Sequence, residues 1–276
     1  MQDGGPPQGA TRDGASLLSE ARHGAVAVLT LTRPEARNSL SLDMLAALQS
    51  AVDRLSGDRE VSAVVLAAAG PAFCAGHDLK ELTAHRRDAD RGRAFYALTM
   101  GRCAAVMTSI MRSPKPFIAA VEGVATAAGC QLVATCDLAV AGAAAKFATP
   151  GVDIGLFCST PMVALSRNVP RKRAMEMLLL GEMIGAREAA DYGLVNRVVG
   201  QGEALDGALA LGRAIASKSP ATIRIGKEAF YAQIERPVAE AYAYASEVMV
   251  RNMMHRDAEE GIGAFIEKRP PAWKGE

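Results

Sequence analysis

The chain has 276 residues, of which 50% are hydrophobic and 22% are charged, and its formal net charge is +1 at pH 7. This size and composition indicate a globular protein with a large core, and the balanced charge argues against nucleic acid as a partner. The longest apolar region, 117–145, is interrupted by Glu122, Asp137 and glycines, so we expect no membrane insertion.

The first half of the chain alternates predicted strands with predicted helices. Short apolar runs predict strands over residues 26–31, 61–70, 117–123, 136–142 and 145–150. Helical spacing of apolar residues predicts helices over 39–55, where Ser41 is the expected N-cap, and over 93–113. This alternation favours an α/β fold with a mostly parallel sheet and crossover helices.

From residue 159 onward the pattern becomes largely helical, and a short apolar run at 193–199 fits either a strand or a connector. Helices are predicted over 170–182, 186–193, 203–218, 220–234, 238–250 and 257–269. Their apolar faces suggest subunit packing. We therefore expect a disordered tail over 1–14, an α/β core over 15–205 and a C-terminal helical region over 206–276.

The cysteines are odd in number and irregularly spaced, which argues against a disulfide framework and against zinc. Reduced thiols predict a cytoplasmic location, and the scattered histidines predict no metal site. The five cysteines are Cys74, Cys103, Cys130, Cys136 and Cys158.

Two loops share one design: "AFCAGHDLKE" at 72–81 and "GVATAAGCQL" at 123–132. Each follows a predicted strand, is built of small residues and leads into a helix, where backbone N–H groups lack intrahelical partners. On neighbouring strands, two such turns can aim two N–H groups at one oxygen, which is an oxyanion hole. Small residues are also expected where a strand and a helix simply pack closely, and spacing alone favours that interpretation without excluding the first.

These loops, together with "AKFATPGVDIGL", "AFIEKRPPAW" and the early "RPEARNSLSLDML", resemble the enoyl-CoA hydratase/isomerase family, the crotonase superfamily. The resemblance covers roughly residues 15–273, and several segments are most similar to its mitochondrial hydratase-domain-containing branch. It implies a spiral of ββα units with a C-terminal helical trimerisation region, assembled as a homotrimer or a dimer of trimers. It also implies an acyl-CoA thioester ligand and no separate cofactor, because coenzyme A is part of the substrate.

Residue roles follow from this resemblance position by position. The backbone N–H groups of His77 and Ala128 correspond to the two oxyanion-hole donors. Phe265 and Lys268 match positions that contact CoA, often from an adjacent subunit. The remaining positions implied to bind substrate are Ala36 at the adenine end, Ala75, Asp78, Leu79, Lys80, Gly129 and Lys227.

Both carboxylates that a hydratase uses are replaced, by Gln131 and Gly151. A glutamine amide does not titrate near neutral pH, and losing a general acid or base costs roughly 10² to 10⁴ in rate. Two substitutes are considered. Asp153 lies on the side of Gly151 if the segment is extended, although it equally fits a surface or capping role. His77 carries an imidazole that can act as a base, or that can simply pack near the CoA site.

Three functional hypotheses remain. The first is an acyl-CoA enzyme that keeps the oxyanion hole but has altered acid–base groups, with isomerisation, thioester hydrolysis or decarboxylation as its reaction. The second is an ordinary enoyl-CoA hydratase of fatty-acid metabolism. The third is a non-catalytic acyl-CoA-binding protein. The two missing carboxylates disfavour efficient hydration and therefore favour the first hypothesis over the second.

Overall fold

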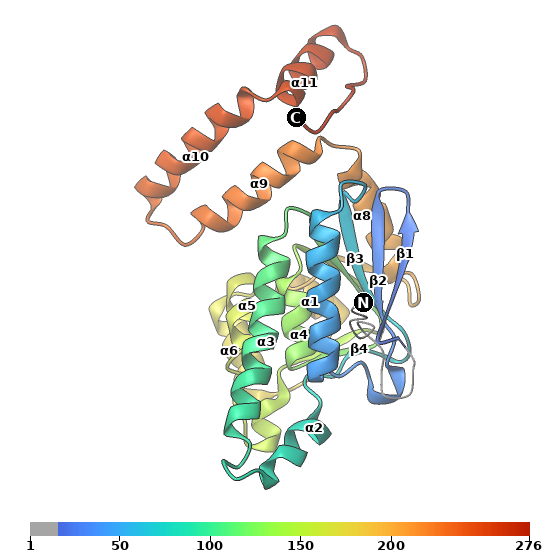
Figure 1. The fold of residues 1–276 in the computed structure, drawn as a ribbon, viewed down its shortest axis with the longest axis vertical. Helices are drawn as coiled ribbons and strands as arrows, with labels where there is room; N and C mark the ends of the chain where they lie inside the picture. Colours follow the sequence, from blue (N-terminus) through green and yellow to red (C-terminus); the bar gives the residue numbers. More distant parts are fainter. Residues whose placement is uncertain (1–15) are drawn as a thin grey trace, which may run out of the picture.

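The computed structural model describes residues 16–276, so the expected tail over 1–14 lies outside the described residues. The larger of its two sheets has six strands in the order β1-β2-β3-β5-β7-β10 (Figure 1). Strand β1 pairs antiparallel with β2, and all other neighbours in this sheet are parallel. The strands are β1 (Leu18–His23), β2 (Val26–Leu31), β3 (Ala63–Ala68), β5 (Phe117–Val121), β7 (Leu138–Gly142) and β10 (Arg197–Val199).

The second sheet contains four short strands, each of two or three residues. They are β4 (Ala72–Cys74), β6 (Val124–Thr126), β8 (Lys146–Ala148) and β9 (Ile184–Gly185). Strands β4, β6 and β8 are parallel neighbours, and they follow β3, β5 and β7 along the chain. A helix comes after each of these strand pairs, so the expected α/β fold of repeated ββα units is confirmed.

Helices cover both faces of the larger sheet. Val64 and Leu66 of β3 belong to one apolar cluster, whereas Val65 belongs to a second cluster on the other face, as strand alternation requires. The second face is covered by α8 (Ala204–Ala216), which contacts β3, β5 and β7. The other helices of this part of the chain are α1 (Leu42–Gly57), α2 (Leu79–Ala84), α3 (Arg93–Arg112), α4 (Ala128–Thr135), α5 (Pro161–Asn168), α6 (Arg171–Leu180) and α7 (Ala186–Asp191), with 3₁₀ turns η1 (Pro34–Ala36), η2 (His85–Arg87) and η3 (Pro150–Ile154).

Helix ends are capped by residues from nearby and distant parts of the chain. The hydroxyl of Ser41 accepts a hydrogen bond from the Met44 N–H, as predicted for the N-cap of α1. At the start of α8, Glu122 Oε1 accepts hydrogen bonds from the N–H groups of Gly202 and Ala204, both at 3.0 Å. The acidic residue at the end of β5 therefore fixes α8 on the sheet.

The five cysteines are free and buried. Burial raises the pKa of the Cys74, Cys103 and Cys130 thiols to about 12. Thiols with such pKa values stay protonated at neutral pH, so these residues behave as small apolar side chains.

The last three helices form an arm that extends away from the sheets (Figure 1). They are α9 (Pro220–Gln233), α10 (Val238–Met253) and α11 (Arg256–Glu267). The expected C-terminal helices are present, while the division of the chain at 205/206 stays a prediction. Large apolar side chains are exposed along the arm, among them Val238, Tyr242, Met254, Phe265 and Ile266.

Within residues 16–276, α3 is the one helix long and apolar enough to cross a membrane, judged by length and composition alone. It packs against α1, and Cys103, Val106 and Ile110 on its inner side are part of the core. The absence of membrane insertion stays a prediction.

Candidate active site

The segment that follows β2 runs alongside the loop that follows β4. The N–H of Ala75 donates to the carbonyl oxygen of Arg37 at 3.0 Å, and the N–H of Leu40 donates to the carbonyl oxygen of Gly76 at 2.8 Å. The N–H of Asp78 completes the ladder by donating to the carbonyl oxygen of Leu40 at 3.3 Å. Two segments that lie far apart in the sequence are therefore held side by side.

His77 sits opposite Leu40 in this parallel bridge. Because the residues before and after His77 make the bonds to Leu40, its own N–H points to the other side of the chain. That N–H has no hydrogen-bond acceptor among residues 16–276. The first predicted donor is therefore unpaired.

The second loop ends in an unusual backbone conformation. Ala127 has φ 50 and ψ −118, values that an alanine rarely adopts. Its own N–H donates to the carbonyl oxygen of Ala148 at 3.0 Å. Helix α4 begins at the next residue, Ala128, so the N–H of Ala128 has no intrahelical partner. The second predicted donor is unpaired as well.

Two glycines allow the loops to touch. A Cβ built on Gly76 would lie 2.9 Å from Ala127 Cβ and 3.4 Å from the backbone nitrogen of Ala128. A Cβ built on Gly129 would lie 2.0 Å from the carbonyl oxygen of Cys74, so α4 approaches β4 more closely than any side chain would permit. Two unpaired N–H groups on touching loops can together stabilise negative charge on one oxygen atom.

Gln131 lies one turn into α4 and is only 5% exposed. Helical side chains lean toward the helix N-terminus, so its amide lies over the first turn, where the Ala128 N–H is exposed at the helix start. The Oε1 atom of Gln131 is buried and has no hydrogen-bond partner among the described residues. This amide can accept a hydrogen bond from a ligand, but it cannot transfer a proton at neutral pH.

Gly151 leaves no room for the second carboxylate. A Cβ built on it would lie 2.6 Å from the carbonyl oxygen of Leu156 and 2.9 Å from Cys158 Sγ. Both atoms would have to move before any side chain could be placed there. The position is therefore filled by backbone and thiol.

Asp153 does not replace that carboxylate. Its segment forms the 3₁₀ turn η3, so the alternation expected of an extended chain does not apply. The side chain is exposed, and its Oδ2 lies 3.2 Å from a Cβ built on Gly181. The structure places Asp153 on the surface.

The imidazole of His77 is neutral at pH 7, because burial lowers its pKa. Its Nδ1 lies 3.4 Å from the carbonyl oxygen of Leu40, while Nε2 is buried without a hydrogen-bond partner in the described part of the chain. Among residues 16–276, the carbonyl oxygen of Leu40 is the one hydrogen-bond partner of this ring.

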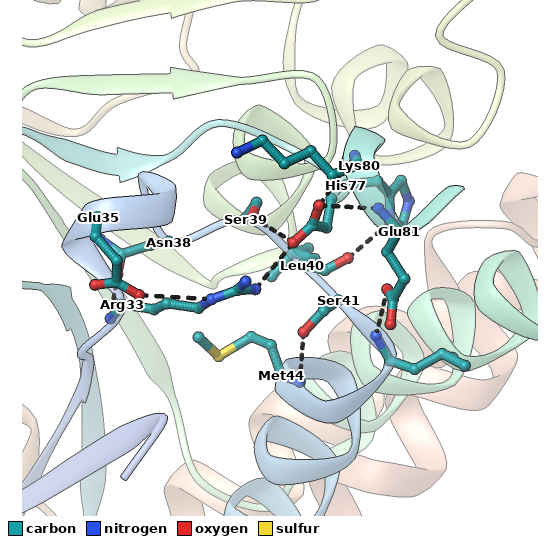
Figure 2. Close-up of polar contacts among 12 residues, drawn as sticks. Arg33, Glu35, Asn38, Ser39, Leu40, Ser41, Met44, His77, Lys80 and Glu81 are labelled. Atoms are coloured by element: carbon teal, nitrogen blue, oxygen red, sulfur yellow. Dashed lines mark hydrogen bonds and ion pairs between the residues drawn. The ribbon is translucent and has the colours of Figure 1, made fainter. Parts of the chain in front are cut away.

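Asp78 joins the two segments through its side chain. Its Oδ1 caps α2 by accepting hydrogen bonds from the N–H groups of Lys80 and Glu81, and its Oδ2 accepts one from Arg33 Nη1 at 3.0 Å. Burial raises the carboxyl pKa, but the hydrogen bonds from Glu81, Arg33 and Lys80 outweigh it, so the pKa is lowered overall. Figure 2 shows Arg33 and Ser39 reaching toward the start of α2. Asp78 thus has a positioning role that its predicted contact with CoA did not include.

The predicted adenine-end segment is rigidly held. Ala36 lies half-buried in η1. Asn38, fully buried, accepts a hydrogen bond from the Arg33 N–H and donates to the carbonyl oxygens of Ala69 and Ala72. The sequence offered one signal for Asn38, since asparagine tolerates the positive φ of 53 that it adopts here.

Leu79 and Lys80 are exposed on α2, next to the first loop. They line a pocket of about 570 Å³. Ala75 is half-buried and Gly129 is buried, both within the two touching loops. These predicted positions lie together.

Lys227 lies apart from the other predicted substrate-binding residues. Its ammonium group donates to the carbonyl oxygens of Ile110 and Lys115, both at 2.9 Å, and to Asp137 Oδ2 at 2.7 Å. These three acceptors use its three protons, which leaves none for a CoA phosphate. The predicted CoA contact is therefore replaced by a buried ion pair that joins α9 to the core.

Phe265 and Lys268 are also absent from the site of their own chain. Phe265 is 85% exposed on α11, and Lys268 caps the end of that helix. Figure 1 shows α11 and α2 at opposite ends of the molecule. A contact between these residues and CoA would require a neighbouring subunit.

No cluster of three or more His, Cys, Asp or Glu side chains able to hold a metal ion occurs within 16–276. The residues gathered at the two loops are instead backbone donors, one amide and one neutral imidazole. Such a set suits an organic ligand whose oxygen gains negative charge.

Two solved structures share the fold of this chain. A crystal structure of an enoyl-CoA hydratase from Mycobacterium smegmatis is 52% identical, with a TM-score of 0.89, and the match covers 94% of this chain and 99% of that one. The crystal structure of human enoyl-CoA hydratase domain-containing protein 3 is 45% identical, with a TM-score of 0.88, covering 93% and 100% of the two chains.

The expected cytoplasmic location is contradicted by the curated relatives. The human enoyl-CoA hydratase domain-containing protein 3, 46% identical over 90% of this chain and 80% of its own, is named as mitochondrial. The rat and mouse proteins, 44% and 45% identical, carry the same name. Reduced thiols are compatible with several compartments, so the cysteines were an insufficient basis for that prediction.

A family model described as enoyl-CoA hydratase/isomerase matches residues 21–276, nearly the whole described chain. This match agrees with the ββα repeat, the two loops and the similar proteins described above, and it establishes the family of the chain. The chain belongs to the enoyl-CoA hydratase/isomerase family, the crotonase superfamily.

Proposed function

We propose that this protein binds an acyl-CoA thioester and stabilises negative charge on the thioester oxygen with the N–H groups of His77 and Ala128. One observation carries the proposal: both N–H groups are unpaired, and they belong to loops that touch through Gly76 and Gly129. Removing one such donor typically costs about 10² to 10³ in turnover. No separate cofactor is required, because coenzyme A is part of the substrate.

The reaction proposed is one that passes through a thioester-derived oxyanion but is not efficient hydration. Hydration needs one group to take a proton from water and another to protonate the α-carbon. Gln131 cannot do either at neutral pH, and the space beside Gly151 is occupied by Leu156 and Cys158. Isomerisation, thioester hydrolysis and decarboxylation remain as reactions of lyase, isomerase or hydrolase type.

A second candidate is acyl-CoA binding without turnover. The closed space at Gly151 and the surface position of Asp153 favour it, because no titrating carboxylate is brought to the two loops. Calorimetry with acyl-CoA, followed by turnover assays on a panel of thioesters, separates the two candidates. Binding without turnover of any thioester supports the second candidate and contradicts the first.

Two measurements test the main proposal. With crotonyl-CoA, loss of the enoyl absorbance should be at least tenfold slower than with a true hydratase, and a rate within about tenfold would refute the proposed effect of the missing carboxylates. Ala128→Pro removes one N–H at the first helical position, which suits proline. Because the residue before a proline avoids the backbone conformation that Ala127 adopts, circular dichroism must first show that this variant is folded. Any catalysed reaction should fall by about 10². Arg256→Pro, at the first position of α11, is the matched control for folding.

We further propose that the arm mediates assembly as a homotrimer or a dimer of trimers. The support is its exposed apolar surface, including Val238, Tyr242 and Met254 at 73%, 73% and 83% exposure. In such an assembly, Phe265 and Lys268 would reach the CoA of a neighbouring subunit. Sedimentation of a single monomeric species at micromolar concentration would contradict this proposal.

A further inference from the structure

Exposed apolar side chains are concentrated on two parts of this molecule. Among residues 16–276, 23 large hydrophobic side chains are exposed, and nine of them lie within 154–183 while eleven lie within 230–266. The first group belongs to η3, α5, α6 and the segments that join them, and the second belongs to the arm. Soluble monomers rarely leave such groups in contact with water, so each group indicates a contact surface.

The first group is called the α5–α6 face. Helix α6 packs against both η3 and α5, which brings these elements together. Met175 and Leu179 are four residues apart and therefore lie on the same side of α6, while Met177 and Leu178 face the core. The α5–α6 face consists of Ile154, Leu156, Phe157, Met162, Val163, Met175, Leu179, Leu180 and Met183, which are between 38% and 58% exposed.

The arm presents a second apolar surface. On α11, the exposed residues Ile262, Phe265 and Ile266 are spaced three and four apart, so they form one apolar side of the helix. On α10, Met249 and Met253 are exposed with the same spacing. The arm and the α5–α6 face are exposed in one and the same chain, so the arm does not cover the face of its own molecule. A second molecule is needed to bring the two surfaces together.

The charges on the two surfaces are opposite in sign. The segment 154–183 carries four basic and two acidic residues, whereas 230–266 carries three basic and six acidic residues. Two faces, or two arms, would bring like charges together, and an arm against a face brings opposite charges together. Such charges set the orientation of an interface more than its strength. Charge complementarity therefore favours contact between the arm of one copy and the face of another.

We propose that the α5–α6 face is the docking surface for the arm of a second copy of this chain. The inference rests on the proposed assembly and names the surface that receives the arm. Each copy then uses its arm toward one neighbour and its face toward another, and a head-to-tail contact of this kind can close into a ring such as a trimer. The face begins at Ile154 of η3, the turn that also contains Gly151, so the arm of a neighbour is seated beside the candidate site.

One charged substitution on each surface tests the contact. Leu179→Asp alters the face and Phe265→Asp alters the arm, and both positions are exposed in the single chain. Because a carboxylate buried without a partner is costly, each variant should raise the dissociation constant of the assembly at least about tenfold and sediment as a monomer at micromolar concentration. Leu98→Asp, at an exposed position outside both surfaces, is the control and should stay assembled. Circular dichroism confirms that each variant is folded.

Mixing the two monomeric variants tests the pairing of arm with face directly. Leu179→Asp keeps an intact arm and Phe265→Asp keeps an intact face, so the mixture contains one productive contact. Native mass spectrometry should therefore detect a pair with one copy of each variant and no larger species. Neither variant should form such a pair by itself.

The remaining outcomes separate this inference from the proposed assembly. If Leu179→Asp stays assembled while Phe265→Asp is monomeric, the arm packs on a different surface; the inference is overturned and the proposed assembly stands. A mixture that yields no pair also overturns the inference. A monomeric wild-type protein overturns the inference and the proposed assembly together, while acyl-CoA binding is measured independently by calorimetry.

Discussion

Removing the ammonium group of Lys227 tests whether the ion pair beneath α9 holds the arm on the core. In Lys227→Met, the carbonyl oxygens of Ile110 and Lys115 lose their donor, at about 1 kcal/mol each. The partner carboxylate of Asp137 is 17% exposed and loses its counter-ion, and breaking a buried pair in this way costs about 3 to 5 kcal/mol.

The carboxylate of Asp137 keeps two hydrogen bonds in this variant, so the expected loss of stability lies near the lower end of that range of about 3 to 5 kcal/mol. Asp137 still accepts from the Phe117 N–H at 2.7 Å and from the Tyr231 hydroxyl at 2.9 Å. We therefore expect the free energy of unfolding to fall by about 3 kcal/mol. Lys172→Met, at an exposed lysine without an ion pair in the described chain, is the control and should change it by less than about 0.5 kcal/mol.

Urea unfolding at one fixed protein concentration measures this loss, since stability depends on concentration if the protein assembles. The single tryptophan, Trp273, donates to the carbonyl oxygen of Ser217 and reports on the arm by fluorescence, while circular dichroism reports on the whole chain. In Lys227→Met/Asp137→Asn, part of the lost stability should return because the unpaired charge is gone. A loss below about 1 kcal/mol in Lys227→Met would refute the reasoning.

Three further predictions follow from single sites. Gly151→Ala should lower the unfolding free energy by about 1 to 3 kcal/mol through overpacking. Gly101→Ala, inside α3 where a Cβ meets no atom within 4 Å, should not lower it, and equal denaturation midpoints for the two variants would contradict the tight packing at Gly151. Burial lowers the pKa of His77 in the folded protein below its ordinary value of 6.5. The contribution of the neutral imidazole to stability is therefore present above pH 6.5 and is lost as the pH falls through the folded-state pKa. The decrease in Tm on acidification should accordingly be smaller in His77→Gln than in the wild type. Glu122→Ala should cost about 1 to 2 kcal/mol by uncapping α8, with Glu182→Ala as an unpaired, exposed control, and thermal denaturation checks both.

The sequence predicted the strands and helices whose periodicity is regular. The region 123–137 was harder, because β6 has three residues and α4 is buried on every side, so neither shows an amphipathic pattern. Strand β1 was missed for a different reason. Its burial pattern is almost entirely exposed, and it is held by pairing with β2 at the sheet edge rather than by an apolar face.

The positions of individual charged groups depended on contacts that local patterns do not contain. Lys227 is paired with Asp137, which lies 90 residues earlier, so nothing near Lys227 in the sequence indicates that it is buried. Asp153 was predicted to share a side with Gly151 only for an extended chain, and the turn η3 removed that condition. By contrast, the two loops were recognisable because close backbone approach requires small residues, a requirement that local sequence does record.

The two missing carboxylates differ in kind, and this difference bears on how the site works. Gln131 keeps the shape of a glutamate, so the volume over the first turn of α4 is preserved and only the ability to titrate is lost. At Gly151 the volume itself is gone, because the Leu156 carbonyl and the Cys158 thiol occupy it. Replacing Gln131 with glutamate would therefore restore one of the two carboxylates, but position 151 has no space for the other. In the proposed function, the backbone N–H groups of His77 and Ala128 therefore do the main work of the site, and the chemistry is limited to what they can stabilise.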